Sequence, residues 1–368
     1  MKQNNRPFII AGPCSVESRE QLWSVSEALC QIPRVRMIRG GVWKPRTRPG
    51  GFEGLGEQAL RWMKEISDSP LRMSDGSRVR FCCEVARPEH VELCQQYGVD
   101  TLWIGARTTA NPFMVEEICE ALRGCSDMQV LVKNPVSPDL NLWIGATERL
   151  QQAGIKYIAA IHRGFNSYRG RVDRHDYRND PLWEIALEFH QMQPGIPLFC
   201  DPSHIGGDSR LVAPLALAAV QLDFDGLLIE VHPSPANALT DAAQQLTPNQ
   251  LATLLSVLPF SCNDNVGLEP LRSQIDDIDH ELLSLLCRRM NLSRQIAIIK
   301  RKRQMPVYQA KRWDEVMSDR LRLADDLGLN PEFIKEVLEK IHSESVRVQM
   351  VQSPNPEETE SQSPRGIM

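Results

Sequence analysis

The sequence lacks any long uninterrupted run of apolar residues along its 368 positions. A helix that crosses a membrane needs roughly 18 such residues in succession. The first residues, MKQNNRPFII, also lack the long apolar core that follows the basic region of a signal peptide. We therefore expect a cytoplasmic protein with no membrane partner.

An excess of charge of one sign is missing as well. The chain has 42 basic and 47 acidic residues, which gives a net charge of -5 at neutral pH. This balance creates no whole-molecule field for nucleic acid, so we expect no nucleic-acid partner and only local positive sites. An apolar share of 42% and a charged share of 24% are typical of a globular chain and exclude the disordered and fibrous classes.

The ten cysteines show no disulfide framework. Frameworks of that kind belong to small secreted domains, whereas several of these cysteines fall inside expected strands and helices of a long chain. We therefore expect free thiols. The cysteines in such positions are Cys82, Cys83, Cys94, Cys119 and Cys287.

The first 260 residues contain a repeated alternation of short strands and helices. Stretches with helical spacing, such as 114–122 and 141–153, separate the strands. Eight such units in about 250 residues predict an α/β fold, the (β/α)8 TIM barrel, with an open doubly wound sheet as the alternative. The expected strands are FIIAGPC (8–14), VRMIRGG (35–41), RVRFCCEV (78–85), TLWIGA (101–106), VLVKNP (130–135), YIAAIHRG (157–164), PLFCDPSH (197–204) and GLLIEVHP (226–233).

The pattern changes after Phe260, where SCNDNVG is polar and no strand signal follows. The last residues, QSPNPEETESQSPRGIM, are rich in proline, serine and glutamate, which is typical of a disordered segment. We therefore expect a barrel domain over 1–260, a linker over 261–268, an all-α domain over 269–352 and a disordered tail over 353–368.

One long helix, residues 269–302, is expected to open the second domain. Apolar residues recur there at alternating spacings of four and three, and a helix of this length runs about 50 Å. A domain that spans only residues 269–352 is too small to bury a helix of this length by itself. We therefore expect a homodimer, or a higher assembly, that forms through this domain. Two further helices, 310–326 and 331–350, complete a three-helix domain. The repeat consists of Leu271, Ile275, Ile278, Leu282, Leu285, Leu292, Ile296 and Ile299.

Ionisable residues follow every expected strand, and in a TIM barrel such residues converge on one mouth. Any one of them alone is typical of a solvated loop charge, but together they form two sets. The first set consists of Cys14, His204, Glu230 and Asp241. Its thiol, imidazole and carboxylate groups suit a divalent ion such as manganese, iron, cobalt or zinc. The other set is cationic and indicates a ligand with phosphates and a carboxylate: Arg39, Lys44, Arg46, Arg107, Lys133 and Arg163.

The motifs AGPCS, GGVWKPRT, GARTT, LVKNP, HRG, DPSHIGG and IEVHPSPANALTD occur in this order over residues 8–258. Their set resembles that of the 3-deoxy-D-arabino-heptulosonate 7-phosphate synthases with a bare or lightly decorated barrel. The resemblance implies that the first set binds a divalent metal. It implies that phosphoenolpyruvate is bound by Arg39, Lys44, Arg107, Lys133 and Arg163, and that erythrose 4-phosphate is bound by Arg46 and Thr47.

The same resemblance implies an aldol-like condensation, in which C3 of phosphoenolpyruvate attacks the aldehyde, water adds at C2 and phosphate leaves. Lys44 is then the expected proton carrier between the substrates. Glu84 is expected near the face that water attacks, and Asp201 is expected to order the metal ligands or the hydroxyl groups of the aldehyde. Asp208 has no role in this scheme and is expected to cap a helix or to face solvent.

Arg289 occupies a position of the apolar repeat of the long helix, and Lys300 lies about three turns further on the same face. A buried arginine needs an acid or an anionic ligand. Together with SESVRVQ downstream, this segment resembles the all-helical chorismate mutases over residues 269–350. The resemblance implies that chorismate is bound by Arg272, Arg289, Lys300, Gln309, Arg312, Ser345 and Gln349.

Chorismate rearrangement needs no cofactor. The resemblance implies that Lys300 and Gln349 donate to the ether oxygen and that Arg272 reaches into the partner's site. The chain departs from the family pattern where Trp313 and Gln309 replace acids, and we expect Asp314 or a water to engage the substrate hydroxyl instead.

The expected function is therefore that of a bifunctional shikimate-pathway enzyme, which makes the heptulosonate phosphate in the barrel and prephenate in the helices. Because the barrel begins near residue 8, we expect feedback inhibition by prephenate or chorismate to act through the helical domain. The alternative is a barrel synthase whose helical domain is only a regulatory or dimerisation module.

Overall fold

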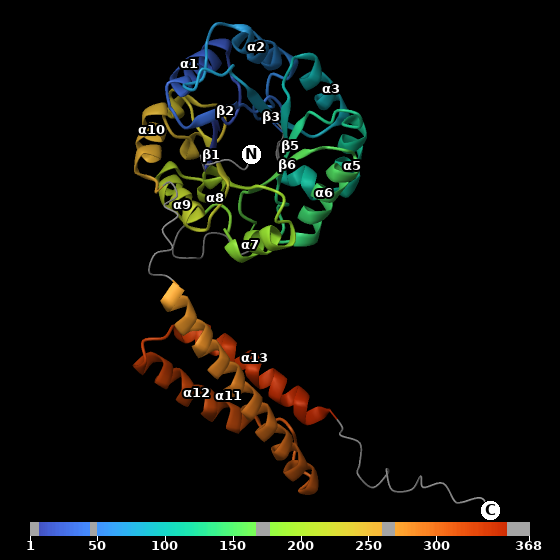
Figure 1. The fold of residues 1–368 in the computed structure, drawn as a ribbon, viewed down its shortest axis with the longest axis vertical. Coiled ribbons are helices and arrows are strands. Elements are labelled where there is room, and N and C mark those ends of the chain that lie inside the picture. The colour runs from blue at the N-terminus through green and yellow to red at the C-terminus, as the bar shows by residue number, and fades with distance from the viewer. Residues whose placement is uncertain (1–6, 45–49, 167–176, 260–268, 352–368) are drawn as a thin grey trace, which may run out of the picture. The chain divides into compact units, whose positions relative to one another are not determined.

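The computed structural model describes residues 7–44, 50–166, 177–259 and 269–351. The chain separates into two compact units, Met1–Cys262 and Asn263–Met368 (Figure 1). The predicted linker, 261–268, and the predicted tail, 353–368, lie outside the described residues.

The first unit is a closed parallel barrel whose eight strands pair in chain order, with β8 returning to β1 (Figure 1). The prediction of a TIM barrel is confirmed, and closure excludes the open doubly wound sheet. Seven of these strands lie within the predicted segments, and β5 begins one residue before its segment, at Gln129. The eight strands are β1 (Phe8–Gly12), β2 (Val35–Arg39), β3 (Phe81–Val85), β4 (Thr101–Ile104), β5 (Gln129–Lys133), β6 (Tyr157–His162), β7 (Leu198–Cys200) and β8 (Gly226–Glu230).

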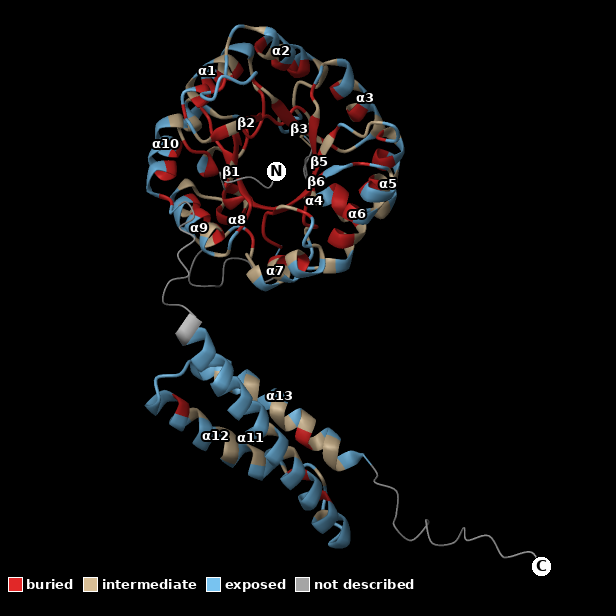
Figure 2. Ribbon diagram, viewed as in Figure 1, coloured by how far each residue is buried: buried red, intermediate tan, exposed pale blue. Residues whose placement is uncertain are grey.

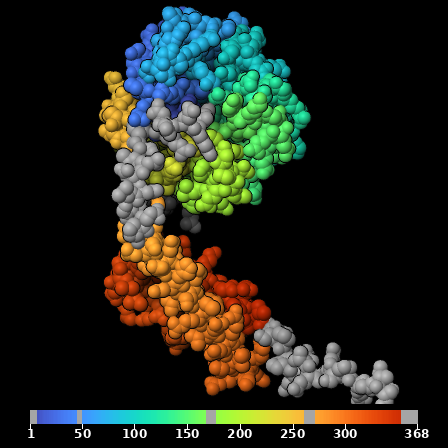
Figure 3. Space-filling view, viewed as in Figure 1, coloured from blue at the N-terminus to red at the C-terminus, as the bar shows by residue number. Residues whose placement is uncertain are grey.

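Helices surround the barrel strands (Figure 1). In the space-filling view the colours of the chain run around this ring in chain order (Figure 3). Two short helices, α4 (Ala106–Thr109) and α8 (Pro202–Gly206), directly follow β4 and β7. The others are α1 (Arg19–Cys30), α2 (Glu57–Asp68), α3 (Pro88–Gln96), α5 (Pro112–Ala121), α6 (Leu140–Gln152), α7 (Trp183–Met192), α9 (Ser209–Gln221), α10 (Pro248–Val257) and the 3-10 turns η1 (Pro235–Asn237) and η2 (Ala242–Gln244).

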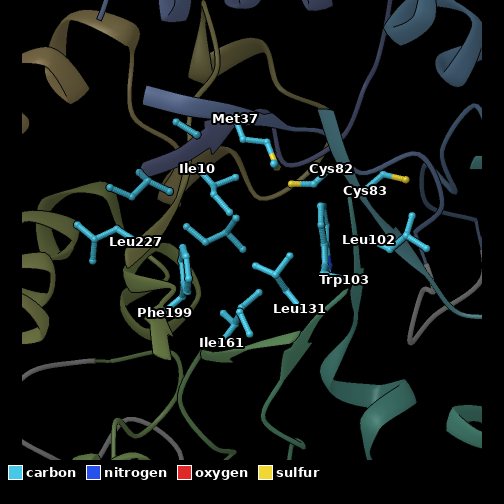
Figure 4. Close-up of a cluster of buried hydrophobic side chains, with 14 of the residues drawn as sticks. Ile10, Met37, Cys82, Cys83, Leu102, Trp103, Leu131, Ile161, Phe199 and Leu227 are labelled. Carbon is cyan, nitrogen blue, oxygen red and sulfur yellow. The ribbon is translucent and has the colours of Figure 1, made fainter. Parts of the chain in front are cut away.

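Strand alternation divides the buried residues between the barrel interior and the surrounding helices. Cys82 belongs to the buried cluster around Trp103 and Leu131, whereas the next residue, Cys83, places its sulfur 3.3 Å from that of Cys94 on α3 (Figure 4). Side chains two residues apart share a face of a strand, so Glu84 points to the same side as Cys82. The last inward residues of several strands therefore lie above the apolar core.

The second unit consists of three helices whose bounds agree with the prediction: α11 (Glu269–Lys302), α12 (Ala310–Asp326) and α13 (Pro331–Met350). Helix α13 packs against both α11 and α12. The turn before α13 contains Gly328 at a φ of 71°, and Asn330 caps α13 by accepting hydrogen bonds from the backbone N–H groups of Glu332 and Phe333. These local signals set where α12 ends and α13 begins.

The apolar repeat of α11 is largely uncovered within one chain. Leu282 is 52% exposed and Leu292 is 57% exposed, and most of α11 carries the colour of exposed residues in Figure 2. A continuous exposed apolar stripe is uncommon on a monomer and marks an interaction surface.

The nine cysteines in the described part of the chain all carry free thiols, as predicted. None of the helices in that part combines the length and the apolar character needed to cross a membrane.

Candidate functional site

A cavity of about 540 Å³ opens at the carboxyl ends of the barrel strands. It contains cations from several loops, which is where the sequence predicted a multiply anionic ligand. The lining residues are Lys44, Glu84, Gly105, Ala106, Arg107, Lys133, Val136, Arg163, Asn166, Arg178, Asn179, His204 and Asp241.

Three of the four predicted metal ligands form a tight group beside this cavity. Potential ligand atoms of Cys14, Glu230 and Asp241 all lie within 4.8 Å of one another. Closure of the barrel produces this proximity, because β1 pairs with β8 and places Gly12 opposite Glu230. Residues that are more than 200 positions apart in the sequence therefore reach one point.

His204, the fourth predicted ligand, adjoins this group. Its Nε2 lies 3.9 Å from Oε1 of Glu230, and its Nδ1 lies 2.8 Å from Oδ2 of Asp201. Asp201 also caps α8 by accepting a hydrogen bond from the His204 backbone N–H at 3.0 Å. Burial lowers the pKa of His204 despite the neighbouring carboxylates, so the ring is neutral, as a metal ligand must be.

The Cys14 sulfur accepts a hydrogen bond from Nζ of Lys44 at 3.1 Å and donates one to Oδ2 of Asp241 at 3.3 Å. Burial, with the charge of Glu230, raises the pKa of Cys14 to about 12, so the group is a thiol at neutral pH. A divalent ion would displace that proton, because a coordinated sulfur binds as the thiolate. One thiol, one neutral imidazole and two carboxylates around a point fit a borderline divalent ion.

Arg39 lies beneath the cavity and is not among the residues that line it. Its side chain is 1% exposed, its Nη2 lies 3.1 Å from Oε1 of Glu230, and its guanidinium carbon lies 4.9 Å from the centre of the Trp103 ring. Burial acts to lower the pKa of Arg39, but Glu230 and Cys14 raise it. In this arrangement Arg39 neutralises a predicted metal ligand.

Three other predicted cations line the cavity itself: Arg107, Lys133 and Arg163. Nζ of Lys133 lies 2.8 Å from Oδ2 of Asp201, which joins this cation to the carboxylate that also contacts His204. Arg163 donates to Oδ1 of Asn179 at 2.8 Å, and burial lowers the pKa of Arg163 to about 10. A desolvated guanidinium binds an incoming anion strongly, because little water must be displaced.

Lys44, in the segment after β2, and Glu84, on β3, line the same cavity. Burial acts to lower the pKa of Lys44, but Cys14 and Glu230 raise it, so the amine is protonated. Glu84 accepts a hydrogen bond from Nε1 of Trp103 at 3.2 Å. A Cβ at Gly105 would lie 2.1 Å from Oε1 of Glu84, so only glycine leaves room for that carboxylate. Arg46 and Thr47 lie outside the described residues.

Sequence reasoning missed three residues that border the metal-ligand group. Arg178 donates to Oδ1 of Asp241 at 3.1 Å and to Oε1 of Gln244 at 2.7 Å, and Gln244 donates to Oε2 of Glu230 at 2.6 Å. Asn179 donates to the backbone carbonyl of His204 at 2.6 Å. The prediction for β6 used only its immediate exit, His162 and Arg163, whereas Arg178 and Asn179 lie far along the loop after β6. The YRND segment was the available signal.

Hydrogen bonds join three of the predicted chorismate-binding residues in the helical unit, Arg289, Ser345 and Gln349. Arg289 on α11 donates to the Ser345 hydroxyl on α13 and, at 3.4 Å, to the Ile341 carbonyl. Gln349 donates to the Ser345 carbonyl at 3.2 Å, and Lys300 donates to the Val307 carbonyl at 2.5 Å. Ser345 is buried, whereas Arg289 is exposed in the single chain.

Two aromatic rings lie beside this cluster. Trp313 stacks on His342 with ring centres 3.9 Å apart and planes 21° from parallel. Burial and the charges of Arg289 and Lys300 lower the pKa of His342, which places both cations near that ring. Asp314, the acid proposed to compensate for Trp313, is exposed.

The other predicted residues of the helical unit are Arg312, Gln309 and Arg272. Arg312 is 71% exposed and lies 3.7 Å from Glu315. Gln309 is the N-cap residue of α12, with no hydrogen bond from its side chain to the helix end. Arg272 is exposed near the start of α11.

Comparison with protein-family models assigns both units. The model described as the DAHP synthetase I family matches residues 2–260, and the model described as chorismate mutase type II matches residues 271–350. The two matches follow one another along the chain and lie in different structural units.

Curated relatives agree with each match. The chain is 32% identical over 238 residues to the phospho-2-dehydro-3-deoxyheptonate aldolase of Thermotoga maritima, an alignment that covers 65% of this chain and 64% of the relative. It is 35% identical over 78 residues to the T-protein of Enterobacter agglomerans, covering 21% of each. The chain therefore spans less than two thirds of the length of either relative.

A solved structure confirms the likeness of the barrel. The crystal structure of phospho-2-dehydro-3-deoxyheptonate aldolase (DAHP synthase) from Thermotoga maritima superposes with a TM-score of 0.58 at 30% identity. The superposition covers 69% of this chain and 68% of that one.

Proposed function

The chain belongs to the DAHP synthetase I family, and from this premise we propose that it is a bifunctional enzyme of the shikimate pathway. The barrel condenses phosphoenolpyruvate and erythrose 4-phosphate to 3-deoxy-D-arabino-heptulosonate 7-phosphate. The chorismate mutase type II region rearranges chorismate to prephenate.

One observation carries the first activity: the group of Cys14, Glu230 and Asp241 lies directly beside a cavity lined by cations. Together with His204, these residues would hold a divalent ion of manganese, iron, cobalt or zinc. When bound there, such an ion would polarise the aldehyde oxygen of the acceptor substrate.

The cations of the cavity bind and separate the two anionic substrates. Arg107, Lys133 and Arg163 hold the phosphate and carboxylate of phosphoenolpyruvate, with Arg39 supporting them through its pair with Glu230. Arg46 and Thr47 hold erythrose 4-phosphate. Fixing both anions in one cavity removes their mutual repulsion and orients the reacting carbons.

The reaction joins C3 of phosphoenolpyruvate to the aldehyde carbon, while water adds at C2 and inorganic phosphate leaves. Lys44 is protonated in the free site, so it gives its proton to the aldehyde oxygen as that oxygen becomes a hydroxyl. Glu84, which lines the same cavity, accepts a proton from the attacking water, and Asp201 keeps His204 and Lys133 in place.

A coupled assay tests this activity. Phosphoenolpyruvate should disappear only when erythrose 4-phosphate is present, with one phosphate released for each molecule consumed. Absence of turnover in metal-loaded protein would contradict the assignment.

The second activity needs no cofactor. Arg289 and Arg312, with Arg272 of the partner subunit, hold the two carboxylates of chorismate in a compact conformer. Lys300 and Gln349 donate to the ether oxygen as it gains negative charge. Loss of chorismate, followed by its absorbance in the absence of other substrates, tests this step.

We further propose a homodimer formed by the apolar stripe of α11. Each member of the stripe that the structure describes is between 45% and 57% exposed in one chain, so a second copy of the same helix is the occupant that matches it in length and pattern. Sedimentation of the full chain at micromolar concentration should give a dimer mass.

We also propose feedback inhibition of the barrel activity through the helical unit. Prephenate or chorismate bound to the helical unit inhibits the barrel activity, which explains why the two units share one chain. Inhibition of the synthase by prephenate should disappear in Arg289→Ala. If that variant loses inhibition but the unaltered chain never turns over chorismate, the helical unit is a regulatory module alone.

A further inference from the structure

Trp43 and His90 form a flat stack next to the barrel cavity, outside every role assigned above. Their ring centres lie 3.9 Å apart and their planes differ by 1°. Trp43 precedes Lys44 in the segment between β2 and α2, whereas His90 lies in the first turns of α3. The stack therefore joins the segment that contains Lys44 to α3, the helix that follows the strand containing Glu84.

Only a neutral His90 makes both of its contacts. Its Nδ1 accepts a hydrogen bond from the backbone N–H of Ala86, two residues after Glu84, at 3.2 Å. A protonated imidazolium has no free lone pair at Nδ1 and would turn an N–H toward that donor. The neutral ring thereby ties α3 to the end of β3 and presents its face to Trp43.

The segment that carries Trp43 is held closely on its other sides. The Lys44 backbone N–H donates to the Glu53 carbonyl at 2.8 Å, and the Gly56 N–H donates to the Val42 carbonyl at 2.9 Å. Gly54 has a φ of 93°, and a Cβ there would lie 2.2 Å from the Val42 carbonyl oxygen. These backbone bonds hold residues 42–44 against residues 53–56, and the Trp43 ring contacts α3 through His90.

The consequence for Lys44 is geometric. Its Nζ lies 3.1 Å from the Cys14 sulfur, and a Cβ at Gly41 would lie 2.7 Å from its Cε, so the side chain is confined to one path. A shift of the preceding residue displaces the ammonium directly. A misplacement of about 1 Å in a reacting group costs roughly a hundredfold in rate.

We propose that Trp43 and His90 are positioning residues of the synthase site, which hold the proton-donating Lys44 against Cys14 through a stack that requires neutral His90. This inference rests on the synthase activity proposed above. Neither residue lines the cavity, so both act through Lys44.

The groups around His90 agree with a neutral ring. Burial and the Arg87 charge lower its pKa, and the opposing charges of Glu89 on α3 and Glu84 on β3 are weaker. We therefore expect synthase kcat to be constant at neutral pH and to fall only below the ordinary histidine pKa of about 6.5.

Four variants of the full metal-loaded chain separate the two contacts. Trp43→Ala removes the stack, and Trp43→Phe keeps a smaller one. His90→Phe keeps a ring without the acceptor, whereas His90→Asn keeps an acceptor without the ring. We expect Trp43→Ala and His90→Phe to lower synthase kcat about tenfold or more with little change in KM for phosphoenolpyruvate. Trp43→Phe and His90→Asn should retain intermediate rates, and the acid limb should move to lower pH in His90→Phe, because His90 no longer titrates.

Trp23→Ala is the matched control, because Trp23 is a partly buried tryptophan on α1 that faces Arg19 instead of a site loop. It should lower the melting temperature without lowering kcat. Equal losses of kcat in Trp23→Ala and Trp43→Ala, or an unchanged kcat in Trp43→Ala, would overturn the proposal. Chorismate turnover should stay unchanged in all five variants.

A second measurement does not depend on activity. The fluorescence of Trp43, taken as the difference between the unaltered chain and Trp43→Phe, should change with pH as His90 titrates, and the change should be absent in His90→Phe. A pH-independent difference overturns the stack. If the fluorescence titrates but phosphoenolpyruvate is never consumed, the synthase assignment fails and the stack stands.

Discussion

Asp201 illustrates what one buried side chain does in the barrel site. It caps α8, and it contacts Lys133 and His204 at 2.8 Å each. Burial acts to raise its pKa, but the contacts with His204 and with the Lys133 ammonium hold that pKa well below its ordinary value. A single carboxylate therefore links a predicted metal ligand to a predicted substrate-binding cation.

Asp201→Asn separates the capping role from the charge. Asparagine caps a helix as well as aspartate does, so α8 should persist while Lys133 and His204 lose their common anion. We expect synthase kcat/KM to fall by about tenfold or more, measured by phosphoenolpyruvate consumption.

Asp208 provides the comparison, since it caps α9 by accepting from the Arg210 N–H at 2.9 Å, as the sequence predicted. Asp208→Ala should lower the free energy of unfolding by about 1 kcal/mol with unchanged kcat. A similar loss of activity in both variants would mean that Asp201 acts only as a cap.

Cys14 permits a test of the metal. Cys14→Ala removes a ligand atom and the hydrogen bonds to Lys44 and Asp241, so synthase activity should be abolished while chorismate turnover continues. Incubation with EDTA should have the same selective effect, reversed by added divalent metal. Full synthase activity after EDTA treatment would exclude the metal site.

At the scale of an element, α11 combines two surfaces in one helix. Its apolar stripe is exposed, and Arg289 interrupts that stripe and reaches Ser345 on α13. A guanidinium such as that of Arg289 needs an anionic partner once it is buried, and an anionic ligand supplies one. Helix α11 therefore contributes both to the proposed interface and to the proposed chorismate site.

Arg289→Ala should abolish chorismate turnover without unfolding α11, because alanine favours helix. Circular dichroism at 222 nm should be unchanged within error while kcat/KM for chorismate falls about a hundredfold or more. Arg294→Ala is the control and should keep full activity. Arg294 is exposed on the same helix, and its side chain donates a hydrogen bond to Oδ1 of Asn291. An unaffected rate in Arg289→Ala rules out its proposed role.

At the scale of the whole molecule, two units with different folds and sites share one chain. Their activities should be separable by point changes, since the barrel site draws only on the first unit and the helical site on the second. The proposed dimer would connect two copies through the apolar stripe on α11.

Leu282→Glu places a charge in the centre of that stripe. We expect the dimer to dissociate at micromolar concentration, with a fall in mass by sedimentation and a loss of chorismate turnover, because Arg272 no longer reaches the partner's site. Glu281→Gln, one position away on the same helix, should leave the mass unchanged. A dimer that persists in Leu282→Glu would place the interface elsewhere.

The positions of the elements followed from local patterns. Seven strands lie within the predicted segments, β5 begins one residue early, and α11, α12 and α13 have their predicted bounds. Burial on one face leaves a period of two or of 3.6 in the chain itself. The candidate site was partly predictable for the same reason: Cys14, Glu230 and Asp241 follow strands whose ends must converge once the barrel closes.

The sequence by itself determined the two folds, their order and the residue types gathered at the barrel mouth. Only the tertiary structure decided which of those groups contact one another: Arg39 pairs with Glu230 beneath the cavity, Arg178 and Gln244 reach the metal ligands from distant loops, and Trp43 stacks on His90. Periodicity is a property of neighbouring residues, whereas contacts between loops depend on how the closed barrel brings separate strand ends together.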